Sequence, residues 1–161
     1  MVPKLPAEKI IVGRSEWCQL PELNIPAIKV RVDSGAKTSA LHAFNIEVFV
    51  RDGIEWVSFE VHPLQRSRAV SFRCEAPIAD RRMVKSTSGV AEQRYVIKTS
   101  MCLGVHNWEI ELTLTNRDSM GYRMLLGRQG MNRHILIDPA ATQNHGRISE
   151  SRLAALYADH L

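Results

Sequence analysis

The chain has 161 residues and a net charge of +4, and hydrophobic residues make up 45% of it against 24% charged residues. These values predict one ordinary globular domain over residues 1–161. No apolar run approaches the roughly 20 residues of a membrane-spanning helix, and residues 1–10 mix Pro, Lys and Glu unlike a signal peptide. The positive charge is spread out without a nucleic-acid recognition motif, so we expect neither a membrane nor a nucleic acid as partner.

Short strands with turn signals between them follow one another along the chain. Alternating or β-branched apolar residues predict strands over residues 28–32, 46–50, 56–61, 95–98, 108–114 and 135–137. Asp52-Gly53 is a strong signal for a tight hairpin turn, and a brief helix is expected after Gly127. Ser149 is suited to cap a helix that continues toward the C-terminus. The pattern predicts an all-β fold, a barrel or a sandwich, with a short C-terminal helix.

The cysteines are widely spaced and odd in number: Cys18, Cys74 and Cys102. This spacing matches neither a disulfide framework nor a Cys-x-x-Cys metal motif. We therefore expect buried or half-buried free thiols in a reducing cytoplasm.

A candidate for chemistry follows the first predicted strand, in the run Asp33-Ser34-Gly35. Aspartate is disfavoured inside strands, so an aspartate at the end of one needs a reason. Gly35 allows a sharp turn that brings backbone amides close to the carboxylate, and the Ser34 hydroxyl can brace the loop. These features hold an acid in place. From the tripeptide alone, a plain Asp-Ser-Gly turn without a catalytic role stays an open alternative.

A second element lies far downstream. It is a short apolar run closed by Gly127-Arg128 and followed by the apolar residues 135–137. By itself this run is typical of an ordinary buried strand and turn.

The two elements in this order resemble the retropepsins, whose barrels carry an Asp-Thr/Ser-Gly-Ala loop early in the chain. A later Gly-Arg element in those proteins has a strand that crosses behind the catalytic loop. The resemblance implies a closed acid-protease barrel in which Asp33 is the catalytic acid, Ser34 braces the loop and Gly35 shapes the carboxylate cradle. It also implies a structural support made of Leu125, Leu126, Gly127 and Arg128.

One bacterial family is closer still. The chain is similar to the RimB-like proteins labelled "ATP-dependent zinc protease", some of which are encoded beside RimK-type ATP-grasp glutamate ligases. The matching stretches are residues 20–23, 25–27, 32–43, 59–63, 111–118, Met120 and 125–128. This resemblance implies an aspartic endopeptidase that acts as a homodimer on a protein or peptide, with a glutamate ligase as a candidate partner.

The number of motifs also favours a homodimer. Aspartic peptidases need two carboxylates that share one proton. The chain has one Asp-Ser-Gly, and no other aspartate repeats the motif. The second carboxylate is therefore expected to be Asp33 of another subunit, related by a two-fold axis.

Four residues that follow Asp33 in the chain are expected to bind substrate: Ala36, Lys37, Gly89 and Arg94. The Ser- and Gly-rich segment 85–90, with Gly89 and leading to Arg94, is a candidate flap over the cleft; a plain surface hairpin is the open alternative. Ala36 and Lys37 follow the motif directly.

Lys37 marks a departure from the retroviral enzymes, in which an aspartate at this place anchors the arginine of the Gly-Arg element. Arg128 must therefore find another partner. The Lys37 charge favours an acidic or glutamylated substrate, although a solvated lysine without a role stays open.

The sequence supports neither zinc nor ATP binding by this chain. It has no His-Glu-x-x-His and no phosphate-binding Gly-x-x-x-x-Gly-Lys-Ser/Thr loop. We expect no metal and no cofactor, although a zinc site built from distant residues such as His42 and His62 stays open. The alternative function is a catalytically silent dimeric module that binds and modulates a glutamate ligase.

Overall fold

The computed structural model describes residues 9–85, 88–117, 121–131 and 134–161. Its strands are β1 (Ile10–Val12), β2 (Ser15–Leu20), β3 (Ile25–Val32), β4 (Ser39–His42), β5 (Phe44–Arg51), β6 (Ile54–Val61), β7 (Phe72–Pro77), β8 (Asp80–Lys85), β9 (Ala91–Leu103), β10 (His106–Thr115), β11 (Met124–Leu126) and β12 (Ile135–Ile137). Its helices are the 3₁₀ turns η1 (Pro21–Leu23) and η2 (Ala158–His160) and the short α-helices α1 (Arg128–Met131) and α2 (Glu150–Leu156).

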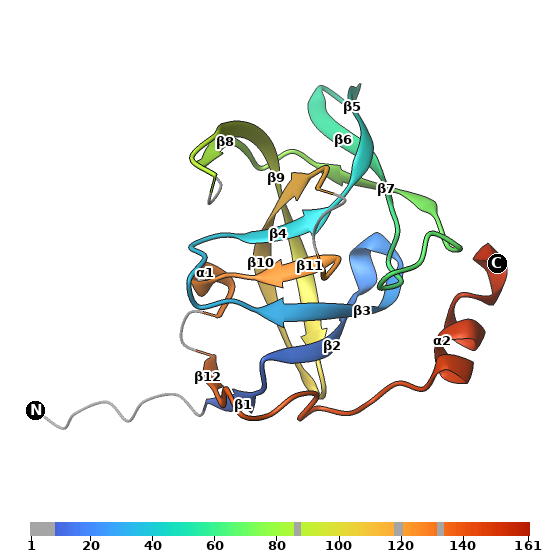
Figure 1. Ribbon diagram of the computed structural model, residues 1–161. Coiled ribbons are helices and arrows are strands. Elements are labelled where there is room, and N and C mark those ends of the chain that lie inside the picture. Colours follow the sequence, from blue (N-terminus) through green and yellow to red (C-terminus); the bar gives the residue numbers. More distant parts are fainter. Residues whose placement is uncertain (1–8, 86–87, 118–120, 132–133) are drawn as a thin grey trace, which may run out of the picture.

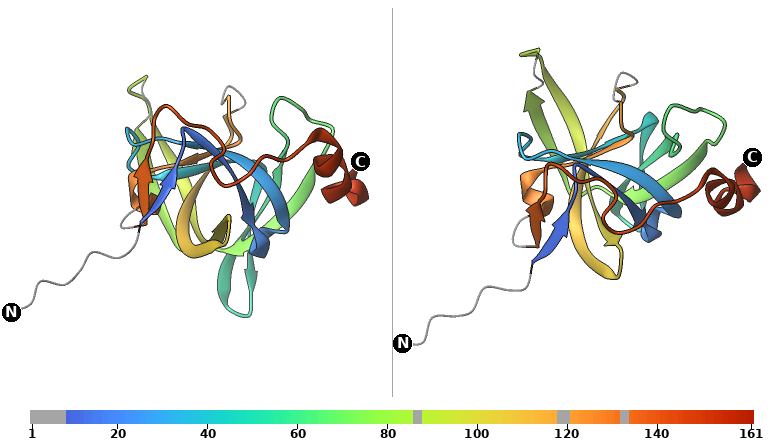
Figure 2. Two further views of the ribbon diagram at one scale, coloured as in Figure 1. Left: turned by 90° about the horizontal axis from the view of Figure 1, so that it is seen from below. Right: turned by 60° about the horizontal axis from the view of Figure 1, so that its bottom comes forward.

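The predicted closed barrel is confirmed. Strands run in the order β10-β4-β11-β3-β2-β9, and β9 pairs back with β10, which closes six strands into a barrel (Figure 1). Strand β8 extends this sheet beyond β9, while β5, β6 and β7 form a separate sheet and β1 pairs in parallel with β12. In the two views of Figure 2, β8 and the start of β9 project beyond the barrel wall.

The barrel core follows from alternation along the strands. In β3, Ile28, Val30 and Val32 are buried, whereas Arg31 between them is exposed. In β10, Ile110 and Leu112 are buried in the same way. Successive side chains of a strand point to opposite faces, so alternation places the apolar set inside, and removal of that apolar area from water stabilises the barrel.

The predicted strands are present, and most of them are longer than the residue ranges predicted from their apolar residues. The β5–β6 turn has φ of +53° at Asp52 and +76° at Gly53, as expected for a tight hairpin of this type. The Ser149 side chain accepts a hydrogen bond of 3.2 Å from the Arg152 amide and caps α2. That helix stops at Leu156 and passes into η2, so it is shorter than the predicted helix.

The cysteines are free thiols, as predicted, with Cys18 and Cys74 buried and Cys102 half-buried. Burial raises the pKa of Cys18 well above its ordinary value and that of Cys74 to about 12, which keeps both thiols protonated. Within the described ranges, every helix is too short or too polar to cross a bilayer.

Strand β11 is the element that positions the Asp33 loop. It lies between two strands, parallel to β3 with Leu126 opposite Val32, and antiparallel to β4 with Leu125 opposite Ala40. Where β11 ends, Gly127 passes so close to the loop that a Cβ atom there would lie 2.5 Å from the carbonyl carbon and oxygen of Thr38. Only glycine fits at this point without a shift of the backbone.

Gly127→Val is therefore expected to destabilise the protein by about 1–3 kcal/mol or more, because the new side chain overpacks the contact with Thr38. For a domain of this size each kcal/mol lowers the melting temperature by about 2–4 °C. Calorimetry or thermal circular dichroism measures the shift. The control is Gly121→Val, since no atom lies within 4 Å of a Cβ at Gly121. Equal melting temperatures for the two variants would contradict the close approach.

Candidate functional site

Asp33 lies directly after β3, half-buried in a turn that the backbone holds. Its amide donates to the Leu126 carbonyl at 2.9 Å, and the Gly35 amide donates to its Oδ1 atom at 3.0 Å. The Ala36 amide donates to the Asp33 carbonyl at 3.2 Å and tightens the turn. The Asp33 carboxylate is thus fixed in direction by the loop that follows it, and Oδ2 is the oxygen that Gly35 leaves available.

The same loop rests on the start of α1. The amides of Arg128 and Gln129 donate to the carbonyls of Ala36 and Lys37 at 2.8 and 3.0 Å. The Arg128 guanidinium donates from Nη1 to the Ser34 carbonyl at 2.9 Å. Arg128 therefore has a backbone oxygen as its partner in place of the retroviral aspartate. Ser34 contributes this carbonyl to the brace, whereas the sequence had suggested its hydroxyl.

Ser39 is a supporting residue that sequence reasoning missed. It is buried at the start of β4, and its Oγ accepts a hydrogen bond of 3.0 Å from the Gly127 amide. Its carbonyl accepts from the Thr113 hydroxyl at 2.9 Å, which ties β10 to the same point. The one available signal was a serine at the start of a short apolar run, and that pattern is too common to be informative.

A cleft of about 640 Å³ opens beside Asp33. Its lining residues are Asp33, Gly35, Ala36, Lys37, Thr38, Ala40, Arg82, Met83, Val84, Lys85, Arg94, Arg117, Leu125 and Gln129. Among these described residues Asp33 is the one acid, and it faces five cationic side chains. Sequence reasoning missed Arg82 and Arg117, because strand pairing and barrel closure bring them to the cleft from distant segments, whereas Lys85 belongs to the predicted flap segment 85–90.

The cations differ in how far their charge is already compensated. Arg82 forms ion pairs of 2.7 Å with both Asp80 and Glu111, and the buried Arg94 pairs with Glu92 at 3.1 Å. The other three make no ion pair with any residue in the described ranges: Lys37, Lys85 and Arg117. The cleft therefore carries an excess of positive charge that an acidic ligand would complement.

The candidate flap is the hairpin between β8 and β9, where Lys85 pairs with Ala91. Its strand β8 forms one wall of the Asp33 cleft, with Met83 largely exposed there. Residues 86 and 87 of the predicted segment lie outside the described residues. Gly89 has φ of +85° and open space around it, and it does not line the cleft, whereas Ala36, Lys37 and Arg94 do.

His42 and His62 lie near each other, with ring centroids 6.5 Å apart, and Phe44 stacks on His62 at 4.5 Å. His42 is buried, and burial together with the Arg123 charge lowers its pKa, which favours the neutral ring. The described residues contain no group of three or more His, Cys, Asp or Glu side chains placed to hold a metal ion. The pair and Phe44 form an aromatic stack at the end of β4.

Known proteins share both this fold and its sequence. A probable alpha-L-glutamate ligase of Parasynechococcus marenigrum is 57% identical over 150 residues, which is 93% of this chain and 32% of that protein. One of the same name from Shewanella halifaxensis is 54% identical over 149 residues, 92% of this chain and 32% of its own length. The chain thus spans about a third of the length of these curated relatives.

The structural comparison agrees. The crystal structure of a Legionella pneumophila protein of unknown function superposes with a TM-score of 0.71 at 26% identity, over 86% of this chain and 100% of that one. The model of the RimB-like family, described as retropepsin-like aspartic endopeptidase RimB, matches residues 11–147. This range contains the barrel, the Asp33 loop and the β11 support, and the chain belongs to the RimB-like family of retropepsin-like proteins.

Proposed function

We propose that the chain is an aspartic endopeptidase that works as a homodimer in the cytoplasm and cuts acidic, including glutamylated, protein segments. One observation carries the proposal. A single carboxylate, Asp33, is held by backbone hydrogen bonds at the edge of a cleft whose other charged residues are cationic.

The chemistry needs two carboxylates in contact, because one acts as the base that activates water while the other polarises the peptide carbonyl. The described lining of the cleft holds one acid, Asp33. The second carboxylate is then Asp33 of a second subunit across a two-fold axis. The Gly35 amide holds Oδ1, which leaves Oδ2 to meet the attacking water or the partner carboxylate.

The cleft also suggests the substrate class. Lys37, Lys85 and Arg117 offer charges that no described residue neutralises, and they would attract carboxylates on either side of the scissile bond. The relatives named as probable alpha-L-glutamate ligases contain a region similar to nearly all of this chain. Glutamate added by a ligase gives an acidic product of the kind that this cleft complements.

A second candidate rests on the same relatives. Because they are about three times longer than the matched region, the similar domain occurs there joined to further chain. A catalytically silent dimeric module that binds and modulates a glutamate ligase would also fit that arrangement.

Asp33→Asn separates the two functions. The wild-type protein is expected to cleave members of an acidic peptide library, and the variant to cleave none, since an amide can neither accept nor share the catalytic proton. Mass spectrometry of the digests provides the measurement. Asp52→Asn, in the β5–β6 turn and not among the residues that line the cleft, is the matched control and should keep full activity. A library left intact by wild-type protein that still binds a glutamate ligase would favour the silent module.

Mixing experiments test the homodimer. Wild-type protein is mixed with an equal amount of Asp33→Asn protein, and the subunits are allowed to exchange. If each active site uses Asp33 from both subunits, only dimers of two wild-type chains are active. The mixture should then have about a quarter of the activity of a sample in which all of the protein is wild type. A chain that acted alone would retain about half. Initial rates over a range of mixing ratios therefore distinguish a quadratic from a linear dependence on the wild-type fraction.

Lys37→Met tests the substrate class. Loss of one exposed charge is expected to raise KM for an acidic peptide about two- to fivefold relative to a neutral peptide of equal length, as for a contact worth about 0.2–1 kcal/mol. The difference should shrink with added salt, because ions screen exposed charges. Lys9→Met, outside the cleft, serves as the control. An unchanged preference would show that Lys37 is a solvated residue without a role in recognition.

A further inference from the structure

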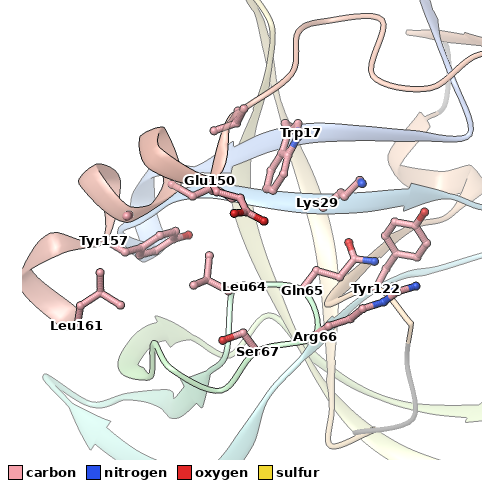
Figure 3. Close-up of a pocket in the computed structure, with 13 residues that line it drawn as sticks. Trp17, Lys29, Leu64, Gln65, Arg66, Ser67, Tyr122, Glu150, Tyr157 and Leu161 are labelled. Carbon is pink, nitrogen blue, oxygen red and sulfur yellow. The ribbon is translucent and has the colours of Figure 1, made fainter.

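A second cavity, of about 570 Å³, lies on the other side of the molecule and shares no lining residue with the Asp33 cleft. In Figures 1 and 2, α2 is on the opposite side of the barrel from α1, which supports the Asp33 loop. The cavity, called the α2 pocket from here on, is open to solvent and bordered by α2, by β2 and β3 and by the loop after β6 (Figure 3).

The walls of the α2 pocket are held in place. The buried Arg123 donates hydrogen bonds of 3.2 Å to the carbonyls of Leu64 and Ser67 and pins the loop that forms the pocket floor. On the other wall, the buried Tyr157 donates its hydroxyl to the Ala27 carbonyl and fixes α2 against β3. A pocket with both walls pinned is preformed, so a ligand would not have to order it.

Two features of the pinned loop cost stability. Arg66 has φ of +57°, a left-handed backbone that is unfavourable for a residue with a side chain. Next to it, the Oε1 atom of Gln65 is buried without a hydrogen-bond partner among the described residues. Strained backbone and unsatisfied buried polar atoms concentrate at binding sites, where a ligand supplies the missing partner.

The charged side chains that line the pocket are not paired with one another. Glu150 directs its carboxylate into the space between Trp17 and Leu64, while Lys29 and Arg66 lie toward the end of the pocket away from Tyr157 (Figure 3). Glu150, Lys29 and Arg66 make no ion pair within the described part of the chain. Lys29 lies 5.9 Å from the Trp17 ring centroid, a cation–π distance that keeps its ammonium group beside the pocket.

One end of the pocket has an apolar surface. Leu64 lies at the end opposite Lys29 and Arg66 in Figure 3, next to the buried Tyr157, and Leu153 of α2 lines the pocket as well. An anion in the middle, two cations at one end and an apolar surface at the other make three recognition elements. An α-amino acid or a short peptide carries groups of the same three kinds, namely a free α-amino group, a carboxylate and an aliphatic side chain.

We propose that the α2 pocket is a second ligand site, separate from Asp33, for the zwitterion formed by an α-amino acid or a short peptide. Its ammonium group binds Glu150, its carboxylates bind Lys29 and Arg66, and an apolar N-terminal side chain packs on Leu64 and Leu153. Two cations against one anion favour a ligand with a net negative charge. The volume accommodates two linked residues, so the dipeptide Leu-Glu is the probe of choice. The site does not depend on peptidase activity.

Isothermal titration calorimetry of the full chain with Leu-Glu tests the site. Saturable binding is expected for wild-type protein and, unchanged, for Lys37→Met, which removes a cation that would hold an acidic ligand in the Asp33 cleft. Free leucine and free glutamate are titrated in the same way. If both bind more weakly than Leu-Glu, the ligand is a short peptide. If either binds as tightly as Leu-Glu or more tightly, the ligand is an amino acid. No saturable heat with any of the three would overturn the proposal.

Capped probes assign the charges. N-acetyl-Leu-Glu should bind wild type about tenfold more weakly or worse, the loss expected for one charge-assisted hydrogen bond. Glu150→Gln should weaken Leu-Glu by a similar factor and leave N-acetyl-Leu-Glu unaffected. Lys29→Met should weaken Leu-Glu but not Leu-Gln-amide, which keeps the ammonium group and has no carboxylate. Asp52→Asn and Lys9→Met, which lie outside the pocket, are the matched controls. Equal affinities for capped and free probes would contradict the assignment.

A measurement on wild-type protein guards against variants that fail to fold. The chain has three tryptophans, Trp17, Trp56 and Trp108, and of these Trp17 lines the α2 pocket. Leu-Glu should shift the indole N–H resonance of Trp17 and leave those of the other two in place. Uniform shifts, or a shift confined to Trp56 or Trp108, would place the ligand elsewhere and overturn the proposal.

Discussion

The insertion of β11 between β3 and β4 is the constraint on which the Asp33 site depends. Leu126 accepts the hydrogen bond from the Asp33 amide, so the strand that fills the barrel wall also sets the start of the loop. Gly127 then passes against Thr38, and its amide is satisfied by Ser39. Gly127 is therefore held by both close packing and a hydrogen bond. Any side chain on Gly127 would separate the two segments that hold the Asp33 carboxylate.

This construction explains how one loop is kept rigid without a side-chain network. The contacts that orient Asp33 come mostly from backbone groups, namely the Gly35 amide on Oδ1 and the α1 amides on the loop carbonyls. Backbone groups of neighbouring strands move little relative to one another, so they preorganise a carboxylate well. The Arg128 guanidinium donates a further hydrogen bond to the Ser34 carbonyl, and this contact stabilises the loop without an acidic residue.

Strand β3 connects the two regions that the structure singles out. Lys29 lies in its middle beside the α2 pocket, paired across the sheet with Trp17, and Asp33 follows its end at the cationic cleft. Residues of one short strand thus take part in both regions, although the two share no lining residue. In both, the fold places charged side chains on a preformed surface and leaves some of them without a described ionic partner, and such charges are the groups that recognise a ligand.

Local pattern in the sequence was sufficient for an all-β fold, the Asp52-Gly53 hairpin and the Ser149 cap, because alternation and turn chemistry act between near neighbours. The likeness of the Asp33 and Gly127 segments to the retropepsins implied the closed barrel in place of a sandwich, and it indicated which acid matters and what supports it. Only the tertiary structure decided the partner of Arg128, the support from Ser39, the position of Gly89 outside the cleft and the gathering of Arg82 and Arg117 around Asp33. These contacts join segments far apart in the chain. Their register depends on how six strands close on one another, and no local pattern carries that information.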